Sequence, residues 1–85
     1  KKEKLNDIEG ALADYDRAIQ LNPNFAETYY ARGVLKFKER DDRASGITDM
    51  RQAARLFNQC ANTQYYQYSI DLLKEWNKEQ AIILK

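Results

Sequence analysis

The chain is short, nearly neutral and rich in helix-forming residues. Its 85 residues are enough for one small domain, and its 14 basic and 13 acidic side chains leave a formal charge of +1. Because the two signs are interspersed, the chain has no general attraction for nucleic acid or for an anionic membrane. The sequence has no histidine, one proline and three glycines, which disfavours acid–base catalysis and favours an all-α fold.

The remaining composition argues against catalytic and cofactor sites. Cys60 is the only cysteine, and without a histidine to activate it we expect an inert thiol and a reducing compartment. The acidic pairs at 14/16 and 41/42 are explained by helix surfaces and caps, and no calcium-binding loop accompanies them. No apolar run is long enough for a membrane span or a signal peptide. We therefore expect a non-enzymatic, intracellular and cytoplasmic protein without cofactors or membrane insertion.

The first expected helix begins near Asp7 and ends at Leu21 or Asn22. Asn6 and Glu9 have the spacing of a capping box, which predicts the helix start. Pro23 predicts a sharp end, because proline has no N–H and disfavours helical dihedrals in the residue before it. The apolar positions of this helix follow a spacing of three and four residues. They are Ile8, Ala11, Leu12, Tyr15, Ala18 and Ile19.

The second expected helix covers residues 25–39. Asn24 and Glu27 form another capping pattern, and the short connection makes the first two helices antiparallel neighbours. Gly33 lies in the middle of this helix, where glycine costs about 0.8–1 kcal/mol relative to alanine. We therefore expect Gly33 to serve a close contact between helices.

Two further helices are expected, over residues 42–59 and 63–82. Asp41 or Asp42 can cap the first of them, and Asn62 with Thr63 the second. The last helix is amphipathic and long enough to extend beyond the helices that it covers. Its aromatic residues could stack nucleic-acid bases, but no row of basic residues accompanies them. Packing in the core is therefore the better interpretation. These residues are Tyr65, Tyr66, Tyr68 and Trp76. The terminal AIILK is expected to continue the helix onto a neighbour, to act as a docking tail, or to be a frayed end.

The first and third expected helices repeat one pattern. At an offset of 35 residues Asp14 aligns with Asp49, and Ala18 aligns with Ala53. Small and large residues also align at this offset: Ala11 with Gly46, Leu12 with Ile47, Tyr15 with Met50 and Leu21 with Leu56. A period of this length is typical of stacked helix pairs, each unable to bury its apolar face alone.

These residues resemble tetratricopeptide repeats, whose units are helix pairs of about 34 residues. Residues 26–57 are similar to one complete unit, and residues 5–23 are similar to the end of another. The Arg32-Gly33 pair and the LNP ending resemble a variant common in cyanobacteria, and NTQYYQYSIDLL resembles its capping helix. The motif positions are Ala11, Tyr15, Ala18 and Pro23 in the first unit and Tyr29, Gly33, Lys36, Phe37, Gly46, Met50 and Ala53 in the second.

The resemblance implies a right-handed superhelix of antiparallel helix pairs, about four helices in one domain. Residues 1–24 would be the second half of a truncated repeat, 25–59 a complete repeat and 60–85 a capping helix. The pattern departs from the family in three places: an extra residue near Asp41, Gly46 where alanine is usual, and no proline after Leu56. The absent proline suggests a longer third helix before the cap.

The resemblance also implies a protein-interaction scaffold that binds a peptide or helix of a partner on its concave face. Alternatively the segment is structural, docking on the rest of a longer chain or self-associating. Because the first unit is half complete, we expect an edge-packed or domain-swapped homo-dimer. The expected groove residues are Glu27, Tyr30, Ala31, Val34, Phe37 and Lys38; alternatively Tyr30, Val34 and Phe37 simply pack against the last helix or a neighbour.

One structural ion pair is expected. Arg32 can pair with Asp14 or with Asp49, since the two aspartates share a repeat position. We interpret this pair as a link between helices and not as ligand recognition.

Overall fold

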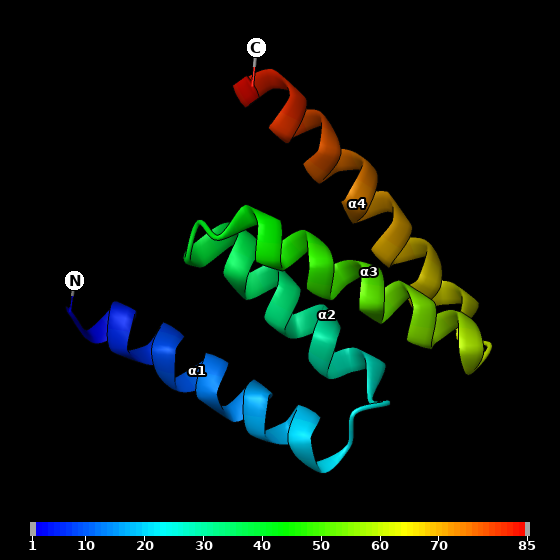
Figure 1. Cartoon of the computed structure of the whole chain (residues 1–85), viewed down its shortest axis with the longest axis horizontal. Helices are drawn as coiled ribbons and strands as arrows, with labels where there is room; N and C mark the ends of the chain where they lie inside the picture. Colours follow the sequence, from blue (N-terminus) through cyan, green and yellow to red (C-terminus); the bar gives the residue numbers. More distant parts are fainter. Residues whose placement is uncertain (1, 85) are drawn as a thin grey trace.

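Four helices and a short π-helical segment make up the fold. The computed structural model describes residues 2–84, and the side chains of residues 7–78. The elements are α1 (Lys2–Leu21), α2 (Ala26–Val34), η1 (Leu35–Glu39), α3 (Arg43–Gln59) and α4 (Thr63–Leu84) (Figure 1). They confirm the predicted all-α fold.

The helices form a flat array with Cα extents of 40 × 38 × 16 Å. Consecutive helices are antiparallel, and α1 and α4 lie on opposite sides of the central α2–α3 pair (Figure 1). The α1–α2 and α3–α4 connections lie at the same end of the array. Each outer helix therefore contacts the central pair from one side, α1 through α2 and η1, and α4 through α3 and the aromatic residues described below.

The predicted helix ends are more accurate than the predicted starts. α1 ends at Leu21, directly before the Asn22-Pro23 turn, as expected. It begins at Lys2 and not near Asp7, so the predicted cap at Asn6 is wrong. The residues before Asn6 are Lys, Glu and Leu, which have high helix propensity and carry the helix through that position.

Two of the other predicted caps are confirmed and one is wrong. Asp42 Oδ1 accepts from the backbone N–H of Ser45 at 3.4 Å, and Asn62 Oδ1 accepts from that of Tyr65 at 3.3 Å. Asn24 does not cap α2: the N-cap residue is Phe25, without a side-chain hydrogen bond. The N–H of Asn24 instead donates to Asn22 Oδ1 at 3.3 Å within the turn around Pro23, so the helix begins later than the pattern indicates.

The C-terminal end of the second helix widens into the π-helical segment η1. The N–H of Arg40 donates to the carbonyl of Leu35 at 3.1 Å, and that of Asp42 to the carbonyl of Lys36 at 2.8 Å. Asp41 follows with φ of 60°. These wide turns occur just before the extra residue of the repeat, and a π turn holds one more residue than an α turn. The insertion is thus absorbed locally, in a form the sequence did not predict.

α2 and α3 approach each other at two glycines. A Cβ added to Gly33 would lie 2.9 Å from the carbonyl oxygen of Gly46, and one added to Gly46 would lie 2.8 Å from that of Gly33. Because real Cβ atoms do not come this close to a backbone oxygen, both positions require glycine. This confirms the close contact expected at Gly33 and explains the departure at Gly46.

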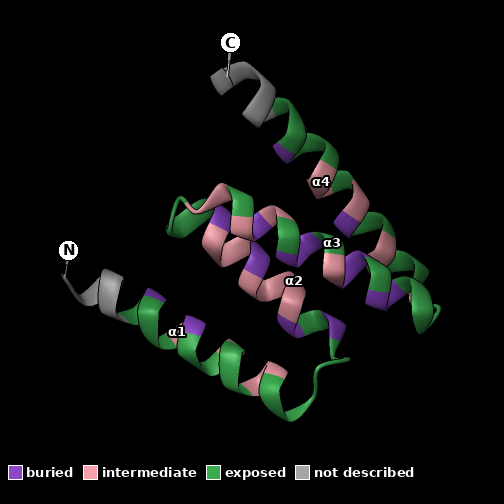
Figure 2. Cartoon of the chain, viewed as in Figure 1, coloured by how far each residue is buried: buried purple, intermediate pink, exposed green. Residues whose placement is uncertain are grey.

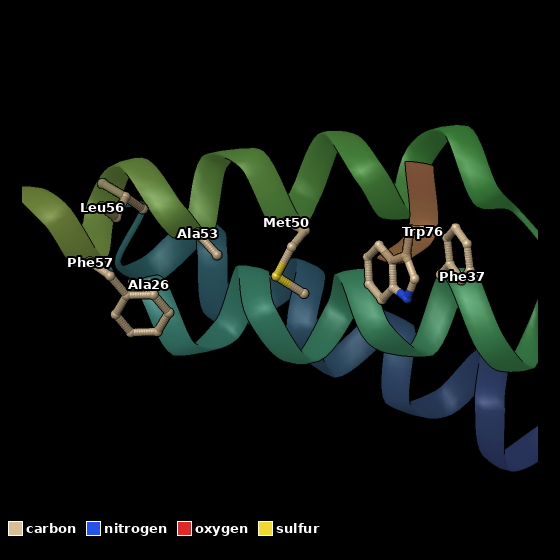
Figure 3. Packing of buried hydrophobic residues seen from close by; sticks show 7 residues of the cluster. All are labelled: Ala26, Phe37, Met50, Ala53, Leu56, Phe57 and Trp76. Atoms are coloured by element: carbon tan, nitrogen blue, oxygen red, sulfur yellow. The ribbon is translucent and has the colours of Figure 1, made fainter. Parts of the chain in front are cut away.

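The core lies along the α2–α3 interface and is closed by one tryptophan from α4. Trp76 is 1% exposed and stacks on Phe37, with ring centroids 4.1 Å apart and planes inclined by 8° (Figure 3). Met50 lies in the middle of this cluster and is fully buried. Figure 2 shows that buried residues are concentrated on the facing sides of α2 and α3, whereas α1 is mostly exposed.

Replacing the crossing glycines is predicted to destabilise the protein. Gly33→Ala or Gly46→Ala forces the two helix backbones apart, which should lower the free energy of unfolding by about 1–3 kcal/mol. Gly10→Ala is the matched control, because a Cβ at Gly10 meets nothing within 4 Å. That change should raise stability by about 0.8–1 kcal/mol through helix propensity. Urea denaturation measures all three, and equal effects at Gly10 and Gly33 would contradict the packing role.

Candidate partner-binding site

A hollow of about 430 Å³ lies between α1 and the second helix. Its wall is mainly apolar or aromatic, and two charged residues, Lys38 and Glu39, lie at one end of the lining sequence. The lining residues are Tyr15 from α1 and Tyr30, Ala31, Val34, Leu35, Lys38 and Glu39 from α2 and η1. A mainly apolar wall that includes two charged residues suits an apolar anchor from a polypeptide.

The predicted groove residues divide into two groups. Tyr30, Ala31, Val34 and Lys38 line the hollow together. Glu27 is exposed but does not line it, and Phe37 is only 4% exposed because its ring stacks on Trp76. The wide turns of η1 advance through a smaller angle per residue than α-helical turns, which displaces Phe37 from the line of Tyr30 and Val34. Phe37 is therefore a core residue.

Tyr30 joins the hollow to the aromatic residues of α3 and α4. Its ring centroid lies 6.2 Å from that of Phe57 and 5.9 Å from that of Tyr65, both with edge-to-face geometry. Partial burial, with smaller contributions from Tyr65 and Tyr68, raises the pKa of the Tyr30 phenol above its ordinary value. The two expectations for Tyr30 thus coexist: the residue packs against α4 and also lines the hollow.

The sequence interpretation missed Tyr15 and Leu35 as lining residues. The sequence places Tyr15 on the apolar face of the first helix and at a motif position of the repeat, but not in the groove. Its alignment with Met50, which packs against the first helix of its own unit, is the signal that indicates it. No signal of comparable strength existed for Leu35, which begins the π-helical segment.

Arg32 links three helices through two carboxylates. Its Nε donates to Asp49 Oδ2 at 2.8 Å and its Nη2 to Asp49 Oδ1 at 2.7 Å, a bidentate pair between α2 and α3. Its Nη1 donates to Asp16 Oδ1 of α1 at 2.7 Å. The hydrogen bonds to Asp49, and secondarily to Asp16, raise the pKa of Arg32 against the opposing effect of burial.

The expected pairing of Arg32 is therefore right for Asp49 and wrong for Asp14. Asp16 lies four residues after Leu12, which is buried, and so lies on the side of α1 near α2. Asp14 is exposed, and its position two residues before Asp16 places it on a different side of α1. A second ion pair, from Arg40 Nη1 to Glu9 Oε2 at 2.6 Å, also joins α1 to the end of η1.

The aromatic residues of α4 are only partly in the core. Trp76 is buried as expected, but Tyr65 and Tyr68 are 40% and 46% exposed. Both remain in ring contact with their neighbours: Tyr65 stacks on Phe57 at 5.3 Å and meets Tyr68 edge to face at 5.5 Å. The side chains of the terminal AIILK lie outside the described residues.

Cys60 and the acidic side chains are the other candidates for a chemical site. Cys60 is a free, exposed cysteine whose Sγ donates to the carbonyl of Phe57 at 3.5 Å. Among the described residues no three His, Cys, Asp or Glu side chains are grouped in a way that could hold a metal ion. No helix in the described part of the chain combines the length and apolarity that crossing a membrane requires.

Comparison with known proteins agrees with the packing of α1 on α2. A family model described as TPR repeat matches residues 4–39, which cover most of α1 together with α2 and η1. Residues 4–39 are therefore similar to a TPR repeat. TPR repeats are protein-interaction modules, typically without catalytic activity. The resemblance to the cyanobacterial variant and the division of the chain into repeat segments at residues 24 and 59 stay predictions. Comparison with curated proteins and with solved structures gives no significant match.

Double-mutant cycles should separate the two ion pairs of Arg32. The Arg32/Asp49 pair is mostly buried, with side chains 17% and 7% exposed, and should show a coupling energy of about 1.5–3 kcal/mol. Asp16 is 57% exposed, so the Arg32/Asp16 cycle should give less than about 1 kcal/mol. The cycles use Arg32→Gln with Asp49→Asn or Asp16→Asn, measured by urea denaturation. Equal coupling in the two cycles would show that burial does not govern the pair.

The raised pKa of Tyr30 predicts a pH dependence of stability. Because the folded state holds this phenolic proton more tightly, its contribution is present below about pH 10 and is lost as pH rises through the folded pKa. Titration of absorbance at 295 nm should show that Tyr30→Phe removes a step with a midpoint above the ordinary value. Removal of a step at or below that value would contradict the burial of Tyr30.

Proposed function

We propose that the chain is a protein-interaction module that binds a peptide or helix of a partner protein on its concave face. The observation that carries the proposal is the mainly apolar hollow between α1 and α2. Tyr15, Tyr30 and Val34 are each half-buried there, so an apolar side chain of a partner can complete their burial. The proposed role involves no chemistry of the chain's own.

The charges near the hollow favour a polypeptide over a purely apolar ligand. Lys38 is exposed, and it lines the hollow together with Glu39, so the lining includes one basic and one acidic residue. A partner with an apolar anchor and a charged flank satisfies both parts, and the apolar contact supplies most of the binding free energy.

Filling the hollow should abolish binding without unfolding the protein. Ala31 lines the hollow and is half-buried, so Ala31→Arg places a long charged side chain where the partner's anchor would lie. The matched control is Ala44→Arg, at an exposed position of α3. Peptides selected from a random library against the wild-type chain should bind Ala31→Arg at least about tenfold more weakly, about 1.4 kcal/mol, and bind the control unchanged.

Isothermal titration calorimetry measures these affinities, and circular dichroism verifies the helix content of both variants. Chemical-shift changes on binding should centre on Tyr15 and Val34. Peptides that bind both variants alike, or shifts centred on another face, would refute the hollow as the binding site.

The alternative function is assembly, in which a second copy covers the same surface. Large apolar side chains at the α1–α2 turn favour it: Leu21 is 79% exposed and Phe25 is 47% exposed. The same two variants distinguish the alternatives. A wild-type dimer in sedimentation equilibrium that Ala31→Arg converts to a monomer supports assembly, and a wild-type monomer of about 10 kDa at high concentration counts against it.

A further inference from the structure

The two repeated helices, α1 and α3, have different surroundings. At the offset of 35 residues, the face of α3 that α2 covers has a counterpart on α1. On α3 this face is buried throughout: Gly46, Asp49, Met50, Ala53 and Leu56. On α1 the aligned residues are half-buried or exposed: Ala11, Asp14, Tyr15, Ala18 and Leu21. α1 thus presents the pattern by which α3 receives a helix, without a helix on it in the described structure.

The contrast is greatest at the apolar positions of this face. Met50 is fully buried, whereas its counterpart Tyr15 is half-buried and lines the hollow. Leu56 is 6% exposed, whereas its counterpart Leu21 is 79% exposed. Covering these side chains would remove apolar surface from water, which favours an occupant that lies along α1.

The second wall of the hollow follows the same correspondence. α2 contacts α3 along its length and also reaches the aromatic residues of α4, where Tyr30 of α2 lies edge to face with Tyr65 of α4. At the same offset Tyr65 aligns with Tyr30, and the buried Ser69 aligns with Val34. α1 and α2 therefore bound the hollow in the same way that α3 and α4 flank α2. A helix in the hollow would correspond to α2.

Charge identifies one residue of the occupant. Asp49 is paired with Arg32 of α2 through two hydrogen bonds, and it also lies 3.4 Å from Lys36 Nζ. Asp14, its counterpart on α1, is exposed and has no ion pair among the described residues. A helix placed on α1 as α2 is placed on α3 would bring a basic residue to Asp14.

We propose that the hollow binds a partner helix of the α2 type, in which an arginine that pairs with Asp14 is followed directly by glycine. This inference rests on the proposed function and specifies its ligand. The glycine is needed where the helices cross, because Ala11, in the position of Gly46, already brings a Cβ to the crossing and the partner helix must add none there. An aromatic residue four positions later takes the place of Phe37, which packs beside Gly46.

The probe is a synthetic, fluorescein-labelled peptide with the sequence of residues 24–42, which contains the Arg-Gly pair and the later phenylalanine. Fluorescence anisotropy measures its binding to the whole chain. Asp14→Asn in the protein should weaken binding about fivefold, as loss of an exposed ion pair does. Asp71→Asn, an exposed carboxylate on α4, is the matched control and should leave the affinity unchanged.

Two peptide variants test the remaining features. Replacing the glycine of the peptide by leucine should lower its affinity by more than about tenfold, because the helices can no longer cross closely. Replacing its arginine by aspartate should weaken binding to the wild-type chain, and Asp14→Arg in the protein should restore it. Restoration by the charge swap identifies Asp14 as the partner, which a loss of protein stability cannot do.

The outcomes separate this inference from the proposed function. A peptide that binds in a way sensitive to Ala31→Arg but not to Asp14→Asn or to the glycine replacement overturns the inference and leaves the hollow as a binding site. Failure of this peptide to bind, while library peptides bind at the hollow, overturns the inference alone. Binding that Ala31→Arg leaves unchanged overturns both.

Discussion

The contact between the backbones of Gly33 and Gly46 is the constraint on which the rest of the fold depends. It lets α2 and α3 approach without intervening side chains, so that the carbonyl oxygen of each glycine lies 2.8 or 2.9 Å from where a Cβ of the other would be. This approach brings Arg32 within bidentate distance of Asp49 and places Phe37 beside α3, where Trp76 can stack on it. The ion pair and the aromatic core are thus consequences of one close crossing.

The electrostatics of the fold are arranged around a carboxylate that is nearly buried. Asp49 is 5% exposed, and burial of a charge is unfavourable unless it is paired and hydrogen-bonded. Arg32 meets this requirement and at the same time contacts Asp16, so that a single guanidinium connects α1, α2 and α3. The link to α1 is the more exposed of the two, and α1 is consequently held more by Ile8 and Leu12 than by charge.

The sequence predicts those features that depend on strong local chemistry. Pro23 ends a helix, Asp42 and Asn62 cap their helices, and a glycine in the middle of a helix indicates a close neighbour. It fails where competing signals have similar strength. Asn6 has the pattern of a cap within good helix-forming residues, and the choice between Asp14 and Asp16 depends on helix rotation, which the repeat alignment does not specify. Of the candidate site, the resemblance to the repeat family indicates Tyr30 and Val34, which line the hollow, but it also indicates Phe37, which does not line it because η1 changes the helical spacing.

The π-helical segment has a consequence for how such units can be joined. An extra residue in a regular helix would rotate everything after it by about 100°, and the apolar face of α3 would no longer meet α2. In η1 the additional residue is accommodated by wide turns and by the left-handed backbone of Asp41. α3 therefore begins with its apolar face directed toward α2. Length and phase are thereby uncoupled: units of unequal length can be placed in series, and each still presents the same side chains to the next.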